Sequence, residues 1–188
     1  MHPTDKHDNA IDELGSDADF AKSLLAREDS QFNRRIYIRA IFAYLEGYAF
    51  FMRRNAEEIL EKRRFLGKDI DPALMFLLRE KVPQIVDGGA VKYRKHKVPF
   101  ADHLAFTMRT IFDALEINRN LFEESEWKPG WIAFKDTLNI RDRVTHPKLQ
   151  SDIGITDGDL EICESGLFWF RSLIQVLSNK NDWGLGKK

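Results

Sequence analysis

An arginine, a carboxylate and a histidine stand close together near the end of one apolar segment: Arg141, Asp142 and His146. Imidazole can accept and donate a proton near neutral pH, and a guanidinium can stabilise charge on a phosphate group. An imidazole beside a guanidinium is the minimum for cleaving RNA without a metal, because the imidazole handles the 2′-hydroxyl or leaving-group proton. Arg141 and His146 are therefore the candidate catalytic residues, with Arg143 and Lys148 as candidate phosphate contacts.

Pro147 determines where the segment that carries this motif ends. Proline disfavours the α conformation in the residue before it, so we expect the helix to end at or just before His146. Residues five apart in a continuous helix lie about 140° apart around its axis, at about 100° per residue. Arg141 and His146 should therefore converge only if the last turn unwinds or a second chain completes the site. In the alternative without chemistry, Arg141 and Asp142 form a surface ion pair and His146 only ends the helix.

This motif resembles that of the HEPN family (higher eukaryotes and prokaryotes nucleotide-binding domain). The family motif is an arginine followed four to six residues later by histidine, commonly with Asn, Asp or His directly after the arginine. Arg141, Asp142 and His146 match those three positions, and the architecture of residues 29 to 180 is similar. The resemblance implies a dimerising helical bundle that cleaves RNA without a metal and leaves 2′,3′-cyclic phosphate products. It further implies that Arg141 and His146 react, that Asp142 orients one of them, and that a second copy of the chain completes the cleft.

Many members of that family act in toxin–antitoxin, abortive-infection and CRISPR systems, so the resemblance allows a cognate antitoxin protein as a partner besides RNA. Two features depart from the usual motif. Asp142 stands where Asn is more frequent, and Pro147 shortens the helix directly after His146. Some family members bind without cutting. A non-catalytic module that binds nucleotide, RNA or protein is therefore the alternative function, and a purely structural interaction bundle is the third.

The elements that must position these residues are predicted to be helices. The longest should begin at the cap Asp29-Ser30 and run to about Arg64, apolar nearly all round between Ile36 and Met52. A helix that is apolar on every side is buried on every side, so it should be the central helix of a bundle or its dimer contact. Other helices are expected to begin at Pro72, Pro99, Pro129 and Thr156 or Asp157, and the last should end about Asn179.

The fold class predicted from these elements is all-α, with one helical domain over residues 17 to 180. Residues 1 to 16 are predicted to be a mobile leader, and residues 181 to 188 a tail. One exception to helix is expected between Gln84 and Val98, where an Asp-Gly-Gly turn separates short β-prone runs. That pattern predicts a small hairpin or an ordered loop.

Two charged features stand out beside the motif. Glu46 lies inside the most apolar segment, so it needs a partner, an exit to solvent or a protonated form; an arginine from the region of Arg141, or Arg39, is the candidate partner. The pair could also do no more than fix helix packing. The basic run from Lys92 to Lys97 includes a tyrosine, and it can either hold a phosphate backbone and stack a base or form a solvated hairpin arm.

Composition further limits the classes of protein and of binding site that this sequence allows. A formal charge of −1 provides no global positive field, so any nucleic-acid binding must come from a local patch. A single cysteine, Cys163, excludes an intrachain disulfide and fits a reducing compartment. We expect Cys163 to be a buried residue without a chemical role. The histidines lack the spacing of metal ligands, and no phosphate-binding glycine loop is present, so we expect no metal and no cofactor. With a polar N-terminus and no apolar run of bilayer length, we expect a cytoplasmic protein without a membrane segment.

Overall fold

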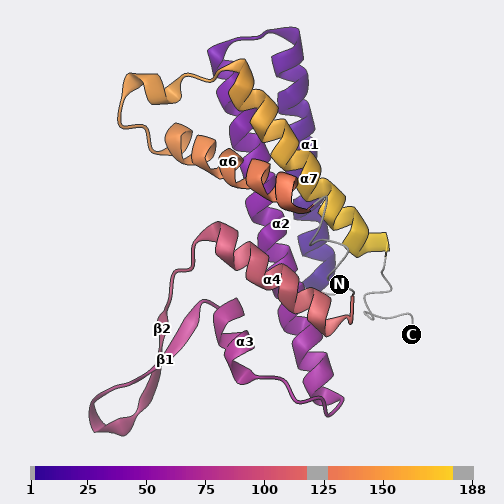
Figure 1. The fold of residues 1–188 in the computed structure, drawn as a ribbon, viewed down its shortest axis with the longest axis vertical. Coiled ribbons are helices and arrows are strands. Elements are labelled where there is room, and N and C mark those ends of the chain that lie inside the picture. The colour runs from indigo at the N-terminus through magenta and orange to yellow at the C-terminus, as the bar shows by residue number, and fades with distance from the viewer. Residues whose placement is uncertain (1–2, 118–126, 180–188) are drawn as a thin grey trace. The chain divides into compact units, whose positions relative to one another are not determined.

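The computed structural model describes residues 3–117 and 127–179 (Figure 1). In these residues the fold is all-α, as predicted, with one small antiparallel hairpin. The helices are α1 Pro3–Arg27, α2 Gln31–Phe65, α3 Pro72–Leu78, α4 Phe100–Ala114, α6 Trp127–Thr145 and α7 Asp157–Asn179. The strands are β1 Lys81–Ile85 and β2 Val91–Lys95, and two short 3-10 segments are η1 Asp87–Gly89 and η2 Gln150–Ile153.

The chain divides into two compact units, where the sequence indicated one bundle. The first unit contains residues 1–47 and 120–188, and the second contains residues 48–119. The division falls within α2, which is continuous from Gln31 to Phe65. No proline, glycine cluster or change of composition marks it, because a helix can supply one half of its length to each of two cores.

In the first unit, α1 differs from the mobile leader predicted for residues 1 to 16. The helix begins at Pro3, and further along it Leu14 lies against Gly47 of α2 while Gly15 lies against Tyr44. The reason is a helical spacing of small and apolar side chains that a composition rich in Asp and His conceals. Ile11, Leu14, Ala18, Ala21 and Leu25 follow at intervals of three and four, and Ala18 and Ala21 are fully buried.

Helices α6 and α7 form the other half of this unit and pack closely. A stacked aromatic cluster joins them, made of Trp131, Phe134, Trp169 and Phe170. Gly166 of α7 permits the close approach, because a Cβ there would lie 2.3 Å from Oγ1 of Thr137 on α6. The Thr137 hydroxyl donates to the carbonyl of Ala133 or that of Ile162, so α6 has a polar as well as an apolar contact with α7. The prediction that α7 ends at about Asn179 is confirmed. The predicted tail lies outside the described residues.

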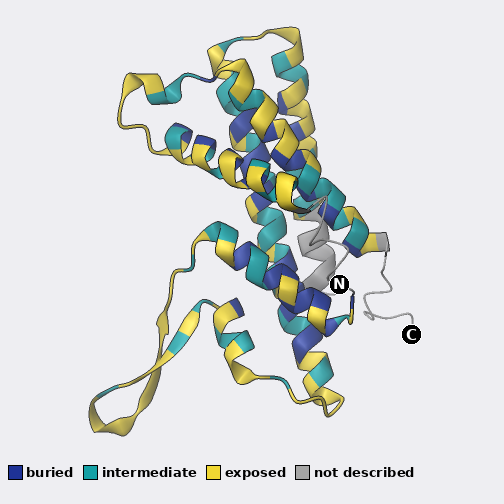
Figure 2. Cartoon of the chain, in the orientation of Figure 1, coloured by how far each residue is buried: buried dark blue, intermediate teal, exposed yellow. Residues whose placement is uncertain are grey.

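The second unit packs the last turns of α2 with α3 and α4. Its buried side chains include Met52, Ile59, Leu60, Leu78, Met108 and Ile111 (Figure 2). Pro72 is the first residue of α3, as predicted, and the Asp71 carboxylate caps the helix by accepting from the backbone N–H of Ala73. Helix α3 ends at Leu78, and Pro83 belongs to β1.

The hairpin predicted between residues 84 and 98 is confirmed, and it begins slightly earlier. Strands β1 and β2 pair antiparallel from Lys81 opposite Lys95 to Ile85 opposite Val91. Gly88 and Gly89 in the turn have positive φ angles of 82° and 78°, a conformation that glycine adopts without strain. Both strands are almost wholly exposed, and the ribbon extends beyond α3 and α4 (Figures 1 and 2).

Among the described helices, none is both long and apolar enough to cross a bilayer.

Candidate functional site

Helix α6 ends at Thr145, directly before His146, as the proline at position 147 predicts. The backbone N–H of His146 still donates to the carbonyl of Asp142 at 2.9 Å, so the histidine backbone continues the helical pattern by one residue. Its side chain is exposed. The imidazole is therefore accessible to a ligand at the carboxyl end of a rigid helix.

Arg141 is held by two carboxylates. One guanidinium nitrogen, Nη1, donates to Oδ1 of Asp142 at 2.9 Å, and Nη2 donates to the Glu46 carboxylate on α2. Burial lowers the pKa of Arg141, but the hydrogen bond to Asp142 and the charge of Glu46 outweigh it and raise the pKa above its usual value. With 32% of its side chain exposed, Arg141 is both fixed and accessible.

The partner of Glu46, the carboxylate within the apolar segment of α2, is Arg141. Of the two candidate partners, the arginine of the motif binds it, and Arg39 does not in the part of the chain that the structure describes. Glu46 also reaches solvent, with 44% of its side chain exposed. Arg39, Ala43 and Glu46, at intervals of four and three, form an exposed stripe along α2. In the first unit the helix is thus not buried on every side. The prediction failed here because an alanine counts as apolar in the sequence whether it lies at the surface or in the core.

The structure does not bring Arg141 and His146 together within one chain. The last turn of α6 stays helical, which leaves the two residues about 140° apart around the helix axis. Among the described residues, the hydrogen bonds of Arg141 go to Glu46 and Asp142, and none joins it to His146. Arg141 faces α2, whereas His146 shares the outer face of α6 with Ile132 and Asn139, both exposed. A site that used both residues would therefore take them from different faces of α6.

Arg143 holds the loop that follows the motif. Its Nη1 donates to the carbonyl of Gly154 at 2.6 Å and to that of Asp152 at 3.2 Å, and its Nη2 pairs with Asp159 at 2.8 Å. Burial raises the pKa of Asp159, but hydrogen bonds from Thr156 and Arg143 outweigh it and hold the pKa below its usual range. The guanidinium therefore ties α6 to the start of α7 and fixes the loop between them.

The same loop is held a second time, by the first turns of α2. Gln31 forms two hydrogen bonds of 2.8 Å with the backbone of Ile155, donating to its carbonyl and accepting from its N–H. Arg34 also donates to the Ile155 carbonyl at 3.0 Å, and Arg35 donates to that of Ile153 at 3.3 Å. Sequence reasoning missed these three residues. Their acceptors in this loop are backbone carbonyls, which every residue has and which no motif reveals.

Lys148 and Asp152 close the turn after Pro147. The Asp152 carboxylate accepts from the backbone N–H groups of Leu149 and Lys148, at 2.9 Å and 2.8 Å, and these bonds lower its pKa. The Lys148 side chain is exposed. Its role as a phosphate contact stays a prediction. For Arg143 the same role also stays a prediction, but its guanidinium already has three protein acceptors.

The thiol of Cys163 and the imidazole of His103, both outside the motif, are buried. The Cys163 thiol is fully buried, as expected, and burial raises its pKa to about 12. His103 on α4 lies in the second unit, with Nδ1 3.8 Å from Oε1 of Glu80 and no hydrogen-bond partner for Nε2 within the described residues. Burial lowers its pKa. Neither group is accessible to a substrate, so neither competes with His146 for a catalytic role.

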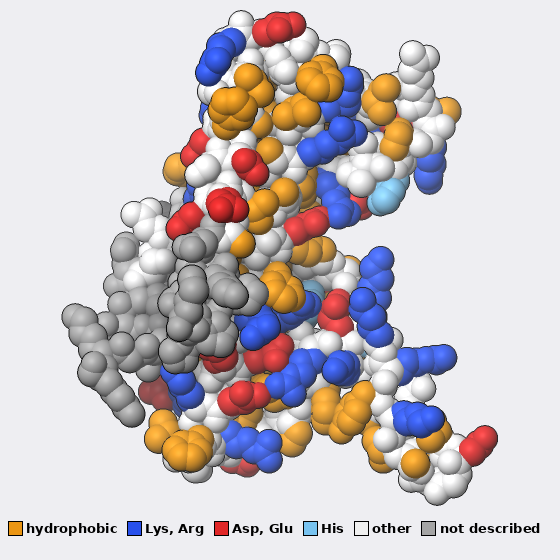
Figure 3. All heavy atoms as spheres, turned by 180° about the vertical axis from the view of Figure 1, so that it is seen from behind, with side chains coloured by type: hydrophobic (Ala, Val, Ile, Leu, Met, Phe, Trp, Pro, Cys, Tyr) orange, Lys and Arg blue, Asp and Glu red, His pale blue; other side chains and the backbone are white. Residues whose placement is uncertain are grey.

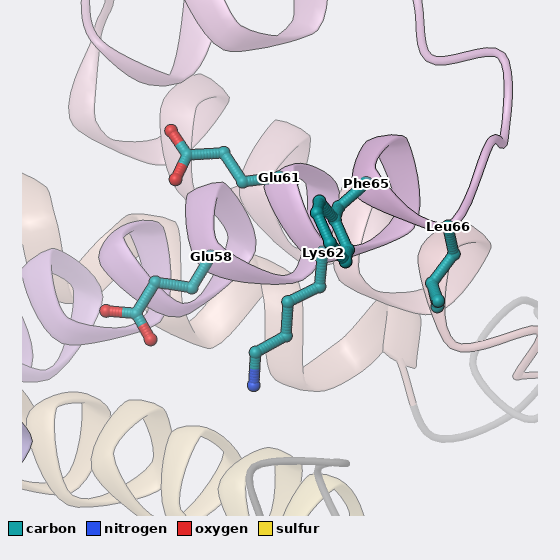
Figure 4. A pocket seen from close by; sticks show the side chains of 5 residues that line it. All are labelled: Glu58, Glu61, Lys62, Phe65 and Leu66. Carbon is teal, nitrogen blue, oxygen red and sulfur yellow. The ribbon is translucent and has the colours of Figure 1, made fainter.

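A shallow hollow lies along the last turns of α2 in the second unit (Figure 4). Its lining consists of Glu58, Glu61, Lys62, Phe65 and Leu66, all from this helix and the residue after it. The hollow is lined by no histidine, serine or cysteine.

No family model, no curated protein and no solved structure matches this chain. Among the described residues, no three or more His, Cys, Asp or Glu side chains gather closely enough to hold a metal ion.

Proposed function

We propose that this protein is a HEPN-like endoribonuclease that cleaves RNA without a metal, as a homodimer. The observation that carries the proposal is that Arg141 and His146 are both accessible and both fixed. Glu46 and Asp142 hold the guanidinium, and α6 together with the doubly held loop fixes the histidine backbone. Catalytic groups act best from rigid elements whose own contacts hold them in place.

In the proposed reaction, His146 takes the proton of an RNA 2′-hydroxyl. The 2′-oxygen then forms a bond to phosphorus while the bond from phosphorus to the 5′-oxygen breaks, and the departing oxygen takes a proton from water. Arg141 stabilises the charge that gathers on the non-bridging phosphate oxygens. His146 then returns its proton to the hydroxide left by that water. The products are a 2′,3′-cyclic phosphate and a 5′-hydroxyl, with no net oxidation and no water consumed.

The geometry within one chain supports the proposed homodimer. Because Arg141 and His146 lie on different sides of α6, the proposed site takes one of them from each copy. Lys148, exposed beside the site, is proposed to contact phosphate. Regulation by a cognate antitoxin, in a toxin–antitoxin or phage-defence setting in the cytoplasm, belongs to the same proposal.

One observation favours the alternative, a non-catalytic module that binds RNA, nucleotide or protein. The guanidinium of Arg141 is shared between two carboxylates, Glu46 and Asp142, and a phosphate must compete with both. A protein that uses Arg141 only to hold α6 on α2 would have the same contacts. Binding of RNA without any product would select this alternative.

The deciding experiment compares His146→Ala with the parent in EDTA, using a labelled RNA and mass analysis of the products. We expect His146→Ala to abolish cleavage while its melting temperature stays nearly unchanged, because the exposed imidazole has no packing role. The matched control is Thr145→Ala, which removes a neighbouring exposed side chain and should cleave like the parent. If the parent leaves RNA intact in EDTA, or if His146→Ala cleaves as well as the parent, the enzyme proposal fails.

A further inference from the structure

The hairpin of the second unit concentrates positive charge on a chain that has none overall. Residues 81–97 contain five Lys and Arg residues and one acidic residue, whereas the whole chain has a formal charge of −1. Figure 3 shows the basic side chains distributed along this hairpin. We call residues 81–97 the arm. A local patch of this kind is the one way in which this chain could attract a polyanion.

The charges of the arm are not used to hold the protein together. At its base, Arg79 pairs with Glu57 and Glu61 on α2 at 2.9 Å and 2.8 Å, and Arg53 of α2 pairs with Glu80 at 3.5 Å. Beyond that base, the pattern changes. Within the described residues, none of the five cations pairs with a carboxylate: Lys81, Lys92, Arg94, Lys95 and Lys97. All five are exposed.

The register places two of these cations against each other. Lys81 lies directly opposite Lys95, and like charges in that position destabilise a hairpin. Directly opposite residues have Cβ atoms about 5 Å apart, so a single anionic group can contact both ammonium groups. A phosphate bound between the two ammonium groups would attract both and offset their repulsion. No ion pair within the hairpin itself, all of which the structure describes, offsets that repulsion.

An exposed aromatic ring stands next to this pair. Tyr93 pairs with Pro83, one pleat along from Lys81 and Lys95, and therefore shares their face of the ribbon. The ring packs on Phe76 of α3 at 5.3 Å between centroids, yet 56% of the residue remains exposed. Tyr93 and Lys95 are about 7 Å apart along the strand, which suits a base on the ring and its phosphate at the lysines.

We infer that the arm binds single-stranded RNA, with phosphates at its cations and an unpaired base stacked on Tyr93. An acidic protein could use the charges but would gain nothing from the exposed ring, and a duplex keeps its bases stacked inside. The choice of RNA among nucleic acids rests on the proposed function. The arm itself needs no cleavage, so the two can be tested apart.

The test measures anisotropy of a labelled single-stranded RNA of twelve nucleotides, in EDTA, with all variants carrying His146→Ala. We expect Lys81→Gln/Lys95→Gln, which removes the two cations on the face of Tyr93, to weaken binding about tenfold and to reduce the slope of log affinity against log salt by about 1.4, since each lost phosphate contact on a single strand removes about 0.7. The control Arg64→Gln/Lys68→Gln removes two equally exposed cations of the same unit outside the arm. Its affinity should stay within about twofold of the parent.

A second variant tests the ring. Tyr93→Leu keeps an apolar contact for Phe76 and should weaken binding about tenfold with an unchanged salt slope, because a stacked base carries no counterions. Circular dichroism should show all variants folded, since these side chains are exposed. Three results would overturn the inference. They are equal losses of affinity in the arm and control variants, an affinity for duplex RNA equal to that for the single strand, and displacement of the labelled RNA by polyglutamate as effectively as by unlabelled RNA.

The outcomes separate the two proposals. If His146 proves dispensable for cleavage, the ribonuclease proposal fails while the difference between arm and control variants still stands. If cleavage requires His146 but binding is indifferent to the arm, only the inference about the arm fails.

Discussion

At the scale of single residues, the site is governed by competition for one guanidinium. Asp142 and Glu46 hold Arg141 in place, and the same two charges would oppose the phosphate of the proposed substrate. Orientation requires a hydrogen-bond acceptor but does not require a negative charge. The two roles of Asp142 can therefore be separated by a substitution that keeps the oxygen and removes the charge.

Asp142→Asn should lower KM for RNA several-fold and leave kcat nearly unchanged. The amide oxygen can still accept from Nη1 of Arg141, and the repulsion between the carboxylate and the substrate phosphate is lost. Steady-state cleavage of a fluorogenic RNA measures both constants, and the effect should shrink at high salt. Asp142→Ala is the control, because it removes charge and acceptor together and should lower kcat. A fall in kcat/KM for Asp142→Asn would mean that the carboxylate itself is needed.

The sequence predicted this part of the site well, and the reason is the kind of partner involved. A lone carboxylate in an apolar helix requires compensation, so Glu46 pointed to an arginine elsewhere, and the structure places Arg141 there. The contacts of Arg143 could not be predicted from the sequence, because two of its three acceptors are backbone carbonyls. Charge complementarity can be read from side-chain types, whereas a carbonyl acceptor depends on where a loop folds.

At the scale of elements, the loop after α6 determines how firmly His146 is placed. Arg143 binds it from α6, and Gln31 with Arg34 bind it from α2. The helix alone would leave the residue after Thr145 free to fray, as helix ends commonly do. The loop thus supports the candidate site, and Lys148 is its one residue proposed to contact phosphate.

Arg143→Lys should lower the free energy of unfolding by about 2 kcal/mol, because an ammonium cannot reach both carbonyls and Asp159 in the planar geometry of a guanidinium. Cleavage should fall as well, since the His146 backbone loses its support. Chemical denaturation measures the first effect and single-turnover cleavage the second.

Lys148→Gln is the counterpart on the same loop, and it should weaken RNA binding without changing stability. Its side chain is exposed and only its backbone N–H holds the turn. An Arg143→Lys protein as stable as the parent, but impaired in RNA binding, would instead make Arg143 a phosphate contact.

Element prediction from sequence succeeded where apolar spacing or a proline decides, and failed where composition misleads. Pro72 and Pro147 mark a helix start and a helix end that the structure reproduces. Residues 3–16 of α1 were predicted to be a leader, because a composition rich in Asp and His hides the helical spacing of small and apolar residues. Burial against α2 stabilises α1, and that contact is not visible in the local sequence.

At the scale of the whole molecule, the same limit explains why the two units were not predicted. A unit boundary is recognised in sequence by a linker, and here α2 continues through it as regular helix. What the sequence did predict at this scale is that Arg141 and His146 lie on different sides of α6, because of the angle between residues five apart in a helix. Arg141 and His146 are five residues apart in a helix that stays helical to Thr145.

A complementation experiment tests whether two copies build one site. Arg141→Ala and His146→Ala should each be inactive as homodimers, and mixing them should restore activity, because a mixed dimer still joins one intact Arg141 to one intact His146 across the interface. Random exchange makes about half of the dimers mixed with one working site of two, so about a quarter of the parent activity should return. Light scattering should give about 44 kDa, twice the 21.9 kDa of one chain. A monomeric mass at concentrations that support cleavage, or an inactive mixture whose chains demonstrably exchange, would place both residues in one chain and remove the reason for a composite site.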